Sequence, residues 1–260
     1  MNLHLLATLF LFAATTANAA EPTVRTWDVD NVKREALIYA PAKKIDGKVP
    51  LVFDFHGHGG TAKHAARTHH IHETWPEAVV VYMQGVPTPG KLTDPEGKKS
   101  GWQSGPGDQG DRDLRFFDAV LASMKTDYAI DDSRIYATGH SNGGGFTYLL
   151  WAKRGETFAA FAPVAAAAGL YFLEAKPKPL FHAVSEKDPL VKFAMQERTF
   201  DRVKKLNATD AKGEEWAKGC LKYSSKNGPS VVIYQHDEGH KYPETTPELI
   251  VKFFKEQVKK

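Results

Sequence analysis

The chain has 260 residues, of which 42% are apolar and 25% are charged, an ordinary composition for a globular protein with a sizeable core. Acidic and basic residues are mixed along the chain and nearly balance, at a formal net charge of +3. This balance excludes the basic surface of a nucleic-acid-binding protein and a polybasic membrane patch. We therefore expect neither nucleic acid nor stable membrane insertion among its interactions.

Residues 1–20 have the pattern of a cleaved signal peptide. No Asp, Glu, Lys or Arg precedes Glu21, and an apolar run ends in the small residues Ala17-Asn18-Ala19-Ala20. The run is about a dozen residues long, short of the roughly 20 that span a bilayer. We expect residues 1–20 to be removed and residues 21–260 to form a single domain, secreted or periplasmic. A buried first helix is the alternative.

Short apolar runs then alternate with helical patterns, which predicts an α/β fold with a mostly parallel central sheet and helices on both faces. The expected strands are 35–39, 51–55, 78–82, 134–138, 158–164, 180–184 and 231–235. The expected helices are 111–128, 146–151, 190–206 and 248–258, and residues 130–133 are expected to form a turn. Asp111 and Asp113 suit the start of their helix, where the dipole favours carboxylates.

A long segment, residues 84–110, interrupts this alternation. It has seven glycines and four prolines among its 27 residues. Because so long a loop is uncommon in a compact domain, we expect an active-site wall or lid, with an ordinary surface loop as the alternative. Trp102 within it is a candidate aromatic wall for a sugar or phenolic ring, or equally a core residue.

The motif Gly139-His140-Ser141-Asn142-Gly143 fits G-x-S-x-G. In that pattern a sharp strand-to-helix turn presents the serine hydroxyl at the carboxyl edge of a sheet, and glycines avoid collisions with the neighbouring backbone. The pattern alone is weak, but an expected strand leads directly in and an apolar helix leads out. Ser141 is therefore the predicted nucleophile, and the adjacent His140 is a candidate substrate contact.

A serine hydroxyl needs a base to take its proton and a carboxylate to orient that base. In folds with this elbow, the acid and then the histidine follow later in the chain. Asp188 and His240 each lie just after an expected strand, so we predict them as acid and base. Glu186 and His236 are the alternatives, and His182, inside a strand, is expected to be a core histidine.

Catalysis on a carbonyl also needs two N–H donors for the oxyanion. One is expected from Asn142, the residue after the nucleophile. The other is expected from the backbone of His58, in the glycine-rich segment after strand 51–55. Glycines there let the backbone approach the substrate closely.

Five motifs between Leu37 and Pro243 carry a family resemblance. They are His56-Gly57, Asp113 with Phe116-Phe117, residues 132–144 (DSRIYATGHSNGG), Asp188-Pro189-Leu190-Val191 and Gly239-His240-Lys241-Tyr242-Pro243. The chain resembles the polyhydroxybutyrate-depolymerase/feruloyl-esterase-like group of secreted α/β-hydrolases. The resemblance implies a catalytic α/β-hydrolase domain over residues 21–260 that hydrolyses esters, with Ser141, Asp188 and His240 as the triad and no cofactor. Ser185 and Tyr242 depart from the group's usual glycine and tryptophan.

Three other interpretations stay open at this stage. Six of the eleven histidines lie between His56 and His72, and such a cluster can bind zinc, although no acidic set accompanies it. A solvated histidine-rich helix explains it more simply, so we expect no metal. The other two interpretations keep the fold: a serine peptidase, or a binding protein with a degenerate hydrolase site.

Overall fold

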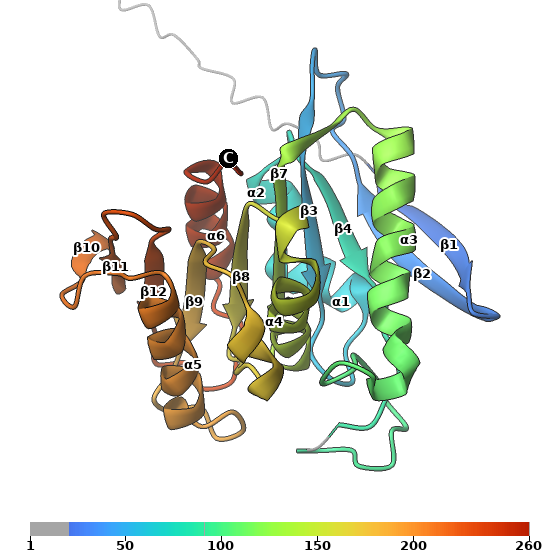
Figure 1. Ribbon diagram of the computed structural model, residues 1–260. Helices are drawn as coiled ribbons and strands as arrows, with labels where there is room; N and C mark the ends of the chain where they lie inside the picture. The colour runs from blue at the N-terminus through green and yellow to red at the C-terminus, as the bar shows by residue number, and fades with distance from the viewer. Residues whose placement is uncertain (1–20, 91, 260) are drawn as a thin grey trace, which may run out of the picture.

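The computed structural model describes residues 21–90 and 92–259 (Figure 1). The expected signal peptide lies outside the described residues. Ten of the described strands form one sheet, in the order β1-β2-β4-β3-β7-β8-β9-β12-β11-β10. Their bounds are β1 Thr23–Val29, β2 Val32–Tyr39, β3 Val49–Phe55, β4 Val79–Met83, β7 Ile130–His140, β8 Ala160–Val164, β9 Leu180–Val184, β10 Glu214–Ala217, β11 Cys220–Tyr223 and β12 Val231–Gln235.

The central six strands, β4-β3-β7-β8-β9-β12, pair in parallel. The outer strands pair antiparallel: β1 and β2 at one edge, β11 and β10 at the other. Because the parallel strands are covered on both faces, they are almost continuously buried; every residue of β3 and β4 is buried. All six have their carboxyl ends at one edge of the sheet, which is where the predicted site residues follow.

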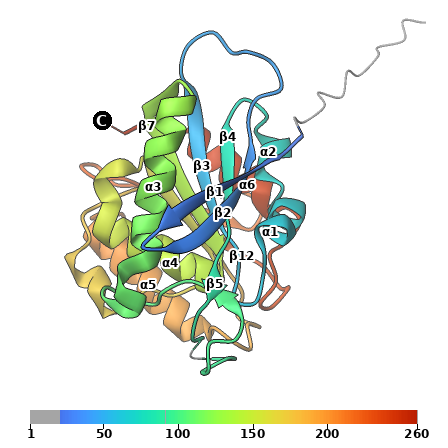
Figure 2. The ribbon, with the colours of Figure 1, turned by 90° about the vertical axis from the view of Figure 1, so that its right-hand side faces the viewer.

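Helices cover the two faces of the sheet, as Figure 2 shows edge-on. α3 (Arg112–Asp127), α4 (Asn142–Arg154) and α5 (Phe193–Leu206) pack on one face, and their apolar side chains join those of the strands in one core cluster. α1 (Ala62–His69), α2 (Ile71–Thr74) and α6 (Thr246–Lys255) cover the other face around a second cluster. The predicted mostly parallel sheet with helices on both faces is confirmed.

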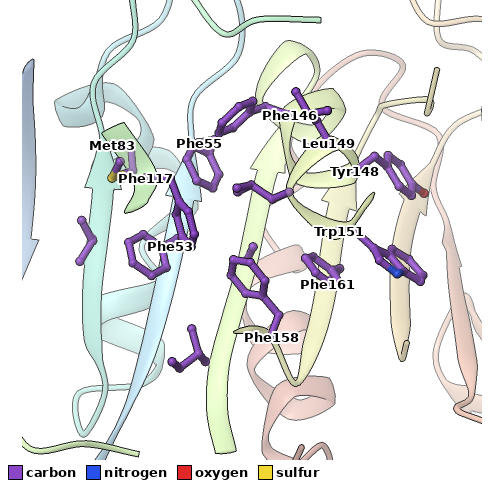
Figure 3. Close-up of a cluster of buried hydrophobic side chains, with 14 of the residues drawn as sticks. Phe53, Phe55, Met83, Phe117, Phe146, Tyr148, Leu149, Trp151, Phe158 and Phe161 are labelled. Atoms are coloured by element: carbon purple, nitrogen blue, oxygen red, sulfur yellow. The ribbon is translucent and has the colours of Figure 1, made fainter. Parts of the chain in front are cut away.

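The larger core is strongly aromatic (Figure 3). Phe53 and Phe55 project from the same face of β3, two residues apart, as the pleat requires. Phe55 packs edge-on against Phe146 of α4, with ring centroids 5.0 Å apart. Trp151 stacks on Phe161 of β8 at the same separation. The helix that follows the G-x-S-x-G turn is therefore fixed on the sheet by large rings, which holds the turn itself in place.

Most expected elements are present, but two differences have physical reasons. Residues 130–133 belong to β7 as a bulge: the pairing with β3 jumps from Val49↔Ile130 to Leu51↔Ile135, and Asp131 accepts a hydrogen bond from the Ser133 N–H. The edge strands β1, β10 and β11 were not predicted, because exposed edges lack the buried apolar run that marks a central strand. No helix within the described segments is both long and apolar enough to cross a bilayer.

The long segment after β4 is ordered by short elements. β5 (Val86–Pro87) pairs with β6 (Ser100–Gly101), and a 3₁₀ turn, η1 (Asp108–Asp111), leads into α3. Asp111 has φ of 59° and its side chain does not cap the helix. The segment therefore returns to the carboxyl edge of the sheet, beside the start of α4. A second 3₁₀ turn, η3 (Leu170–Glu174), follows β8.

Candidate active site

Ser141 lies on the sharp turn between β7 and α4, with φ of 55° and ψ of −118°. A non-glycine residue in this region is strained, and such strain typically marks functional positions. The flanking glycines are required sterically. A Cβ on Gly143 would lie 2.1 Å from the carbonyl oxygen of Phe55, and one on Gly139 would lie 2.7 Å from the backbone of Gly143. The turn therefore presents the Ser141 hydroxyl at the edge of the sheet.

The structure brings the three predicted triad side chains together. The Ser141 hydroxyl lies 2.8 Å from His240 Nε2, and His240 Nδ1 lies 2.8 Å from Asp188 Oδ2. The carboxylate can only accept, so Nδ1–H donates to it and Nε2 keeps the lone pair that can take the serine proton. The Asp188 side chain is fully buried, whereas that of His240 is 15% exposed. These residues follow β7, β9 and β12, whose ends meet at this edge.

Asp188 is held by more than its histidine. Its Oδ1 accepts hydrogen bonds from the N–H groups of Leu190 and Val191, both at 2.9 Å. Its Oδ2 also accepts from Gln196 Nε2, on α5, at 3.1 Å. With these acceptor positions filled, the carboxylate has one orientation, and that orientation aims Oδ2 at His240.

The Gln196 amide is fixed in turn by a buried histidine. His182 Nε2–H donates to Gln196 Oε1 at 3.1 Å, and the Tyr148 hydroxyl lies 2.8 Å from His182 Nδ1. Complete burial lowers the pKa of His182 to about 4, so its ring is neutral at ordinary pH. His182 is thus the satisfied core histidine that its place in a strand predicts. It also links α4 through Gln196 to the predicted acid.

The loop that carries His240 is tied down at two points. His140 Nε2–H donates to the carbonyl oxygen of His240 at 2.9 Å. Burial is the main cause that lowers the pKa of His140 to about 3, which keeps this ring neutral. The Ser185 hydroxyl accepts from the Gly239 N–H at 3.2 Å. Ser185, which stands where the resembled family usually has glycine, therefore joins the loop of Asp188 to the loop of His240.

The backbone N–H groups of Asn142 and His58 are the predicted oxyanion donors, and both residues line the cavity beside Ser141. Neither the Asn142 nor the His58 amide takes part in the backbone hydrogen bonds of the described residues. The Asn142 side chain is clamped: Oδ1 accepts from Trp102 N–H at 2.7 Å, and Nδ2 donates to Trp102 O at 3.0 Å. His58 Nε2 contacts Asp94 Oδ2 at 3.1 Å. Both candidate donors are thus positioned by the segment 84–110.

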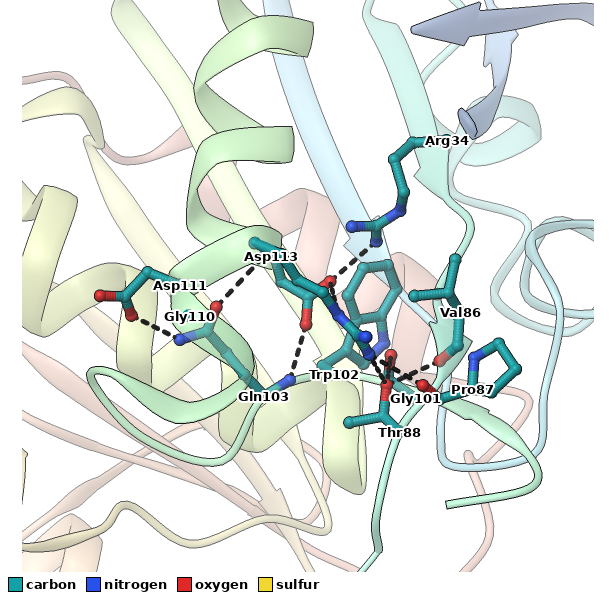
Figure 4. A network of polar contacts seen from close by, with 12 residues as sticks. Arg34, Val86, Pro87, Thr88, Gly101, Trp102, Gln103, Gly110, Asp111 and Asp113 are labelled. Atoms are coloured by element: carbon teal, nitrogen blue, oxygen red, sulfur yellow. Dashed lines mark hydrogen bonds and ion pairs between the residues drawn. The ribbon is translucent and has the colours of Figure 1, made fainter. Parts of the chain in front are cut away.

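That segment is itself anchored by a buried polar network (Figure 4). Asp113 Oδ1 pairs with the Arg34 guanidinium at 2.8 Å, and both side chains are almost completely buried. Asp113 Oδ2 accepts from the Gln103 N–H at 2.8 Å, while Gln103 Nε2 donates to Asp111 Oδ1 at 2.8 Å. Asp111 and Asp113 therefore bind the loop instead of capping α3. The loop is a fixed wall, which supports the wall interpretation over a plain surface loop.

A cavity of about 430 Å³ opens above Ser141 and His240. Its lining is mainly apolar, supplied by the loop after β8, by α5 and its preceding turn, and by segment 84–110. The apolar members are Leu92, Ala166, Ala167, Ala168, Tyr171, Leu190, Val191 and Met195. Its polar members are His58, Thr93, Gln103, Ser104, His140, Ser141, Asn142 and His240. We call this cavity the acyl pocket, because its apolar lining would suit the acyl half of an ester.

Comparisons with known proteins agree with this geometry. The model of the prolyl oligopeptidase family matches residues 96–185. A probable feruloyl esterase C from Aspergillus clavatus is 30% identical over 115 residues, which is 42% of this chain and 37% of that protein. A bifunctional acetylxylan esterase/xylanase from Neocallimastix patriciarum is 29% identical over 168 residues, 63% of this chain and 23% of that protein. The chain thus spans well under two thirds of these curated relatives.

The fold comparison is more complete. The structure of an acetyl xylan esterase from Aspergillus awamori superposes with a TM-score of 0.70 at 13% identity, over 90% of this chain and 99% of that one. The chain has the α/β-hydrolase fold, and its sequence is similar to parts of feruloyl and acetylxylan esterases. The similarity to feruloyl esterases that the motifs predict is thereby confirmed.

One predicted substrate contact of this α/β-hydrolase is wrong. The Trp102 side chain is fully buried and does not line the acyl pocket. It stacks on Phe146, with centroids 5.4 Å apart, and its indole N–H donates to His56 O at 2.9 Å. Burial of so large a ring is favourable, because the free energy gained grows with the apolar surface removed from water. Only the backbone of Trp102 reaches the site, through Asn142. His140, the other candidate contact, does line the acyl pocket.

The alternative acid and base lie elsewhere. Glu186 is exposed and accepts from Gln235 Nε2. His236 Nδ1 accepts from the Glu238 N–H, so that ring is turned toward its own loop. Neither is brought to Ser141. Gln196 and Tyr171 could not be predicted from the sequence, because residues of these types in a helix or turn carry no motif and reach the site only through the fold.

The histidines between 56 and 72 point to different partners. His56 Nε2 accepts from the Gly85 N–H, His69 Nδ1 contacts Asp54 at 2.8 Å, and His72 Nδ1 contacts the Tyr82 hydroxyl at 2.9 Å. Among the residues that the structure describes, no three His, Cys, Asp or Glu side chains are placed to hold a metal ion together. The metal-binding interpretation therefore finds no support in this cluster.

Proposed function

We propose that this chain is a serine carboxylic-ester hydrolase that works through an acyl-enzyme. The observation that carries the proposal is the unbroken hydrogen-bonded series Asp188–His240–Ser141 beneath an apolar cavity. A serine whose proton can pass to an oriented, neutral imidazole is an activated nucleophile. The names of the relatives, feruloyl and acetylxylan esterases, agree with ester cleavage.

In the proposed first step, His240 Nε2 takes the Ser141 proton as the hydroxyl oxygen attacks the ester carbonyl. The N–H groups of Asn142 and His58 stabilise the oxyanion, and removing one such donor typically costs about 3–4 kcal/mol of transition-state stabilisation. The protonated His240, stabilised by Asp188, then gives its proton to the leaving alcohol. In the second step water, deprotonated by the same imidazole, releases the acid and restores Ser141.

We further propose that the substrates are feruloyl or acetyl polysaccharide esters, or hydroxyalkanoate esters, met outside the cytoplasm. The acyl pocket is large and apolar enough for an aromatic or branched acyl group, within the roughly 300–1,000 Å³ of small-molecule sites. Location outside the cytoplasm rests on residues 1–20 as a signal peptide. Its test is sequencing of the mature N-terminus, which should begin at or near Glu21.

The direct test of the activity compares the intact mature chain with Ser141→Ala on acetyl, butyryl, hydroxybutyryl and feruloyl esters. If the triad acts as a unit, the variant loses on the order of 10⁶ in kcat. A stoichiometric phosphonate inhibitor should label Ser141 and no other residue. Near-normal ester turnover by the Ser141→Ala variant would overturn the proposal.

A serine peptidase is the second candidate, favoured by the match of residues 96–185 to the prolyl oligopeptidase family. The same triad can cleave an amide if the leaving amine is protonated. A peptide anilide series run beside the ester panel separates the two. The esterase proposal expects ester turnover to exceed amide turnover by orders of magnitude, and the reverse ranking would favour the peptidase.

A further inference from the structure

The peptide bond between Gly57 and His58 is fixed from its carbonyl side. The Gly57 carbonyl oxygen accepts two hydrogen bonds, one from the Gly60 N–H at 2.9 Å and one from His56 Nδ1 at 2.7 Å. In a planar trans peptide the C=O and the following N–H point in opposite directions. Fixing the Gly57 carbonyl therefore also fixes the His58 N–H, which is directed away from His56 and Gly60.

The His58 N–H is free to bind a ligand. It takes part in no hydrogen bond among the described residues, and His58 lines the acyl pocket together with Ser141. A Cβ on Gly57 would lie 3.5 Å from Ser141 Cβ, so the peptide bond passes directly beside the nucleophile. An N–H in this place suits an oxyanion, and its direction determines how strongly it can stabilise one.

The tautomer of His56 decides whether its ring can donate to the Gly57 carbonyl. His56 Nε2 accepts a hydrogen bond from the Gly85 N–H at 2.9 Å. Because Nε2 must keep its lone pair for this contact, the proton of the neutral ring lies on Nδ1, which is then the donor. Burial is the main cause that lowers the pKa of His56 to about 4, so the ring is neutral at ordinary pH.

The segment 84–110 holds His56 in place. His56 is 1% exposed, and the indole N–H of Trp102 donates to its carbonyl oxygen at 2.9 Å. Gly85 leaves no room for a side chain, because a Cβ there would lie 2.6 Å from Gly101 O and 3.1 Å from His56 Cε1. The backbone of the segment therefore approaches the imidazole closely enough to set its tautomer.

We propose that His56 is a positioning residue for the oxyanion site: its Nδ1–H orients the Gly57–His58 peptide bond so that the His58 N–H points at the oxyanion of the reacting ester. The Gly85 N–H selects the tautomer that does this. The inference rests on the proposed esterase function and adds to it a side chain that acts through a neighbouring peptide bond. Loss of the Nδ1–H donor should impair stabilisation of the oxyanion and leave ground-state binding of the ester unchanged.

The test compares two substitutions that each keep one half of the hydrogen bonding of the imidazole. His56→Asn places an amide N–H where Nδ1 lies and can still donate to the Gly57 carbonyl. His56→Gln reaches the position of Nε2, where it can accept from the Gly85 N–H, but it has no donor at Nδ1. Because loss of a whole oxyanion donor costs about 10²–10³ in kcat, we expect His56→Gln to lower kcat on esters about 10- to 100-fold, with KM within about threefold. His56→Asn should recover most of that kcat.

A second readout separates orientation of the oxyanion donor from stability. A trifluoromethyl ketone that carries the acyl group of the substrate adds to Ser141: the hydroxyl oxygen bonds to the ketone carbon, His240 takes the proton, and the ketone oxygen becomes an oxyanion. The affinity for this ketone should fall in His56→Gln by the same factor as kcat. His72→Gln is the matched control, because it replaces another histidine whose pKa burial lowers to about 4, one that contacts the Tyr82 hydroxyl. It should leave kcat and ketone affinity unchanged.

The tautomer can also be measured in the unsubstituted protein. Nitrogen-15 NMR of histidine-labelled chain should show His56 neutral from about pH 8 to about pH 5, with its proton on Nδ1. A proton on Nε2 would overturn the proposal even if neither variant folds. Equal losses of kcat in His56→Gln and His56→Asn, or a ketone affinity that His56→Gln leaves unchanged, would do the same. If the unsubstituted chain cleaves no ester and binds no ketone, the esterase proposal itself fails, and the role of His56 fails with it.

Discussion

The buried pair of Arg34 and Asp113 offers a quantitative test of how the site is held. The two side chains are 1% and 0% exposed, and their charged atoms lie 2.8 Å apart. Burial lowers the pKa of Arg34, and the neighbouring Asp113 carboxylate opposes that shift. Asp113→Asn keeps the size of the side chain but leaves the guanidinium buried without a counter-charge. Breaking a buried pair in this way costs about 3–5 kcal/mol, a large share of the roughly 5–15 kcal/mol of a typical domain.

The assay is urea unfolding of four chains: the unsubstituted protein, Asp113→Asn, Arg34→Met and the double variant. Because the double variant has no unpaired charge, it should be less destabilised than the sum of the single variants by about 2 kcal/mol or more. Asp30→Asn is the matched control, because its pair with Arg115 lies on the surface at 2.7 Å, with both side chains nearly half exposed. That substitution should cost at most about 1 kcal/mol.

The same variants report on function. Asp113 accepts from the Gln103 N–H, and the neighbouring Trp102 backbone clamps Asn142. We therefore expect folded Asp113→Asn protein to lose ester turnover at temperatures far below its unfolding midpoint, with kcat affected more than KM. The argument fails if Asp113→Asn unfolds with a loss under about 1 kcal/mol, or if the cycle shows no coupling between Arg34 and Asp113.

Three further outcomes follow from the site. Asn142→Ala removes both hydrogen bonds to the Trp102 backbone and should lower kcat on esters about 10- to 100-fold, because the N–H of residue 142 is then held less firmly toward the oxyanion. An unchanged kcat would show that the contact with Trp102 does not contribute to catalysis. Asp188→Asn should lower kcat about 10⁴-fold with little change in KM, because the amide favours the wrong His240 tautomer. The free energy of unfolding should fall as the pH drops from about 6.5 towards 4. The folded-state pKa of His182 is lowered to about 4, so in this range only the unfolded chain binds the proton. At pH 5 this difference lowers the free energy of unfolding by about 2 kcal/mol. His182→Asn should flatten this pH dependence, and an identical slope in both proteins would contradict it.

The positions of the predicted triad could be read from the sequence because each lies at the end of a strand with a strong apolar pattern. β9 and β12 have the predicted bounds, Leu180–Val184 and Val231–Gln235. Once strands are parallel, their carboxyl ends meet at one edge, so Asp188 and His240 follow from local pattern and topology alone. The assignment of their chemical roles remains a prediction that the Ser141→Ala test addresses.

Residues that act through distant partners could not be found in this way. Asp113 looked like a helix-start carboxylate, but its partner Arg34 lies 79 positions earlier, on a strand whose amphipathic pattern does not mark an internal charge. Trp102 had two equal interpretations, and only the position of Phe146 across the core decided between them. Burial and pairing of this kind depend on which elements become neighbours, and single-sequence periodicity contains no such information.

The two halves of the proposed reaction centre are supported from separate parts of the fold. The predicted acid, Asp188, is oriented from α4 and α5 through His182 and Gln196. Asn142, the proposed oxyanion donor, is oriented from β2 and α3 through segment 84–110. Both sets of contacts converge on the turn that holds Ser141, and these surroundings maintain its strained backbone. Loss of either set of contacts is therefore expected to disturb the geometry around Ser141.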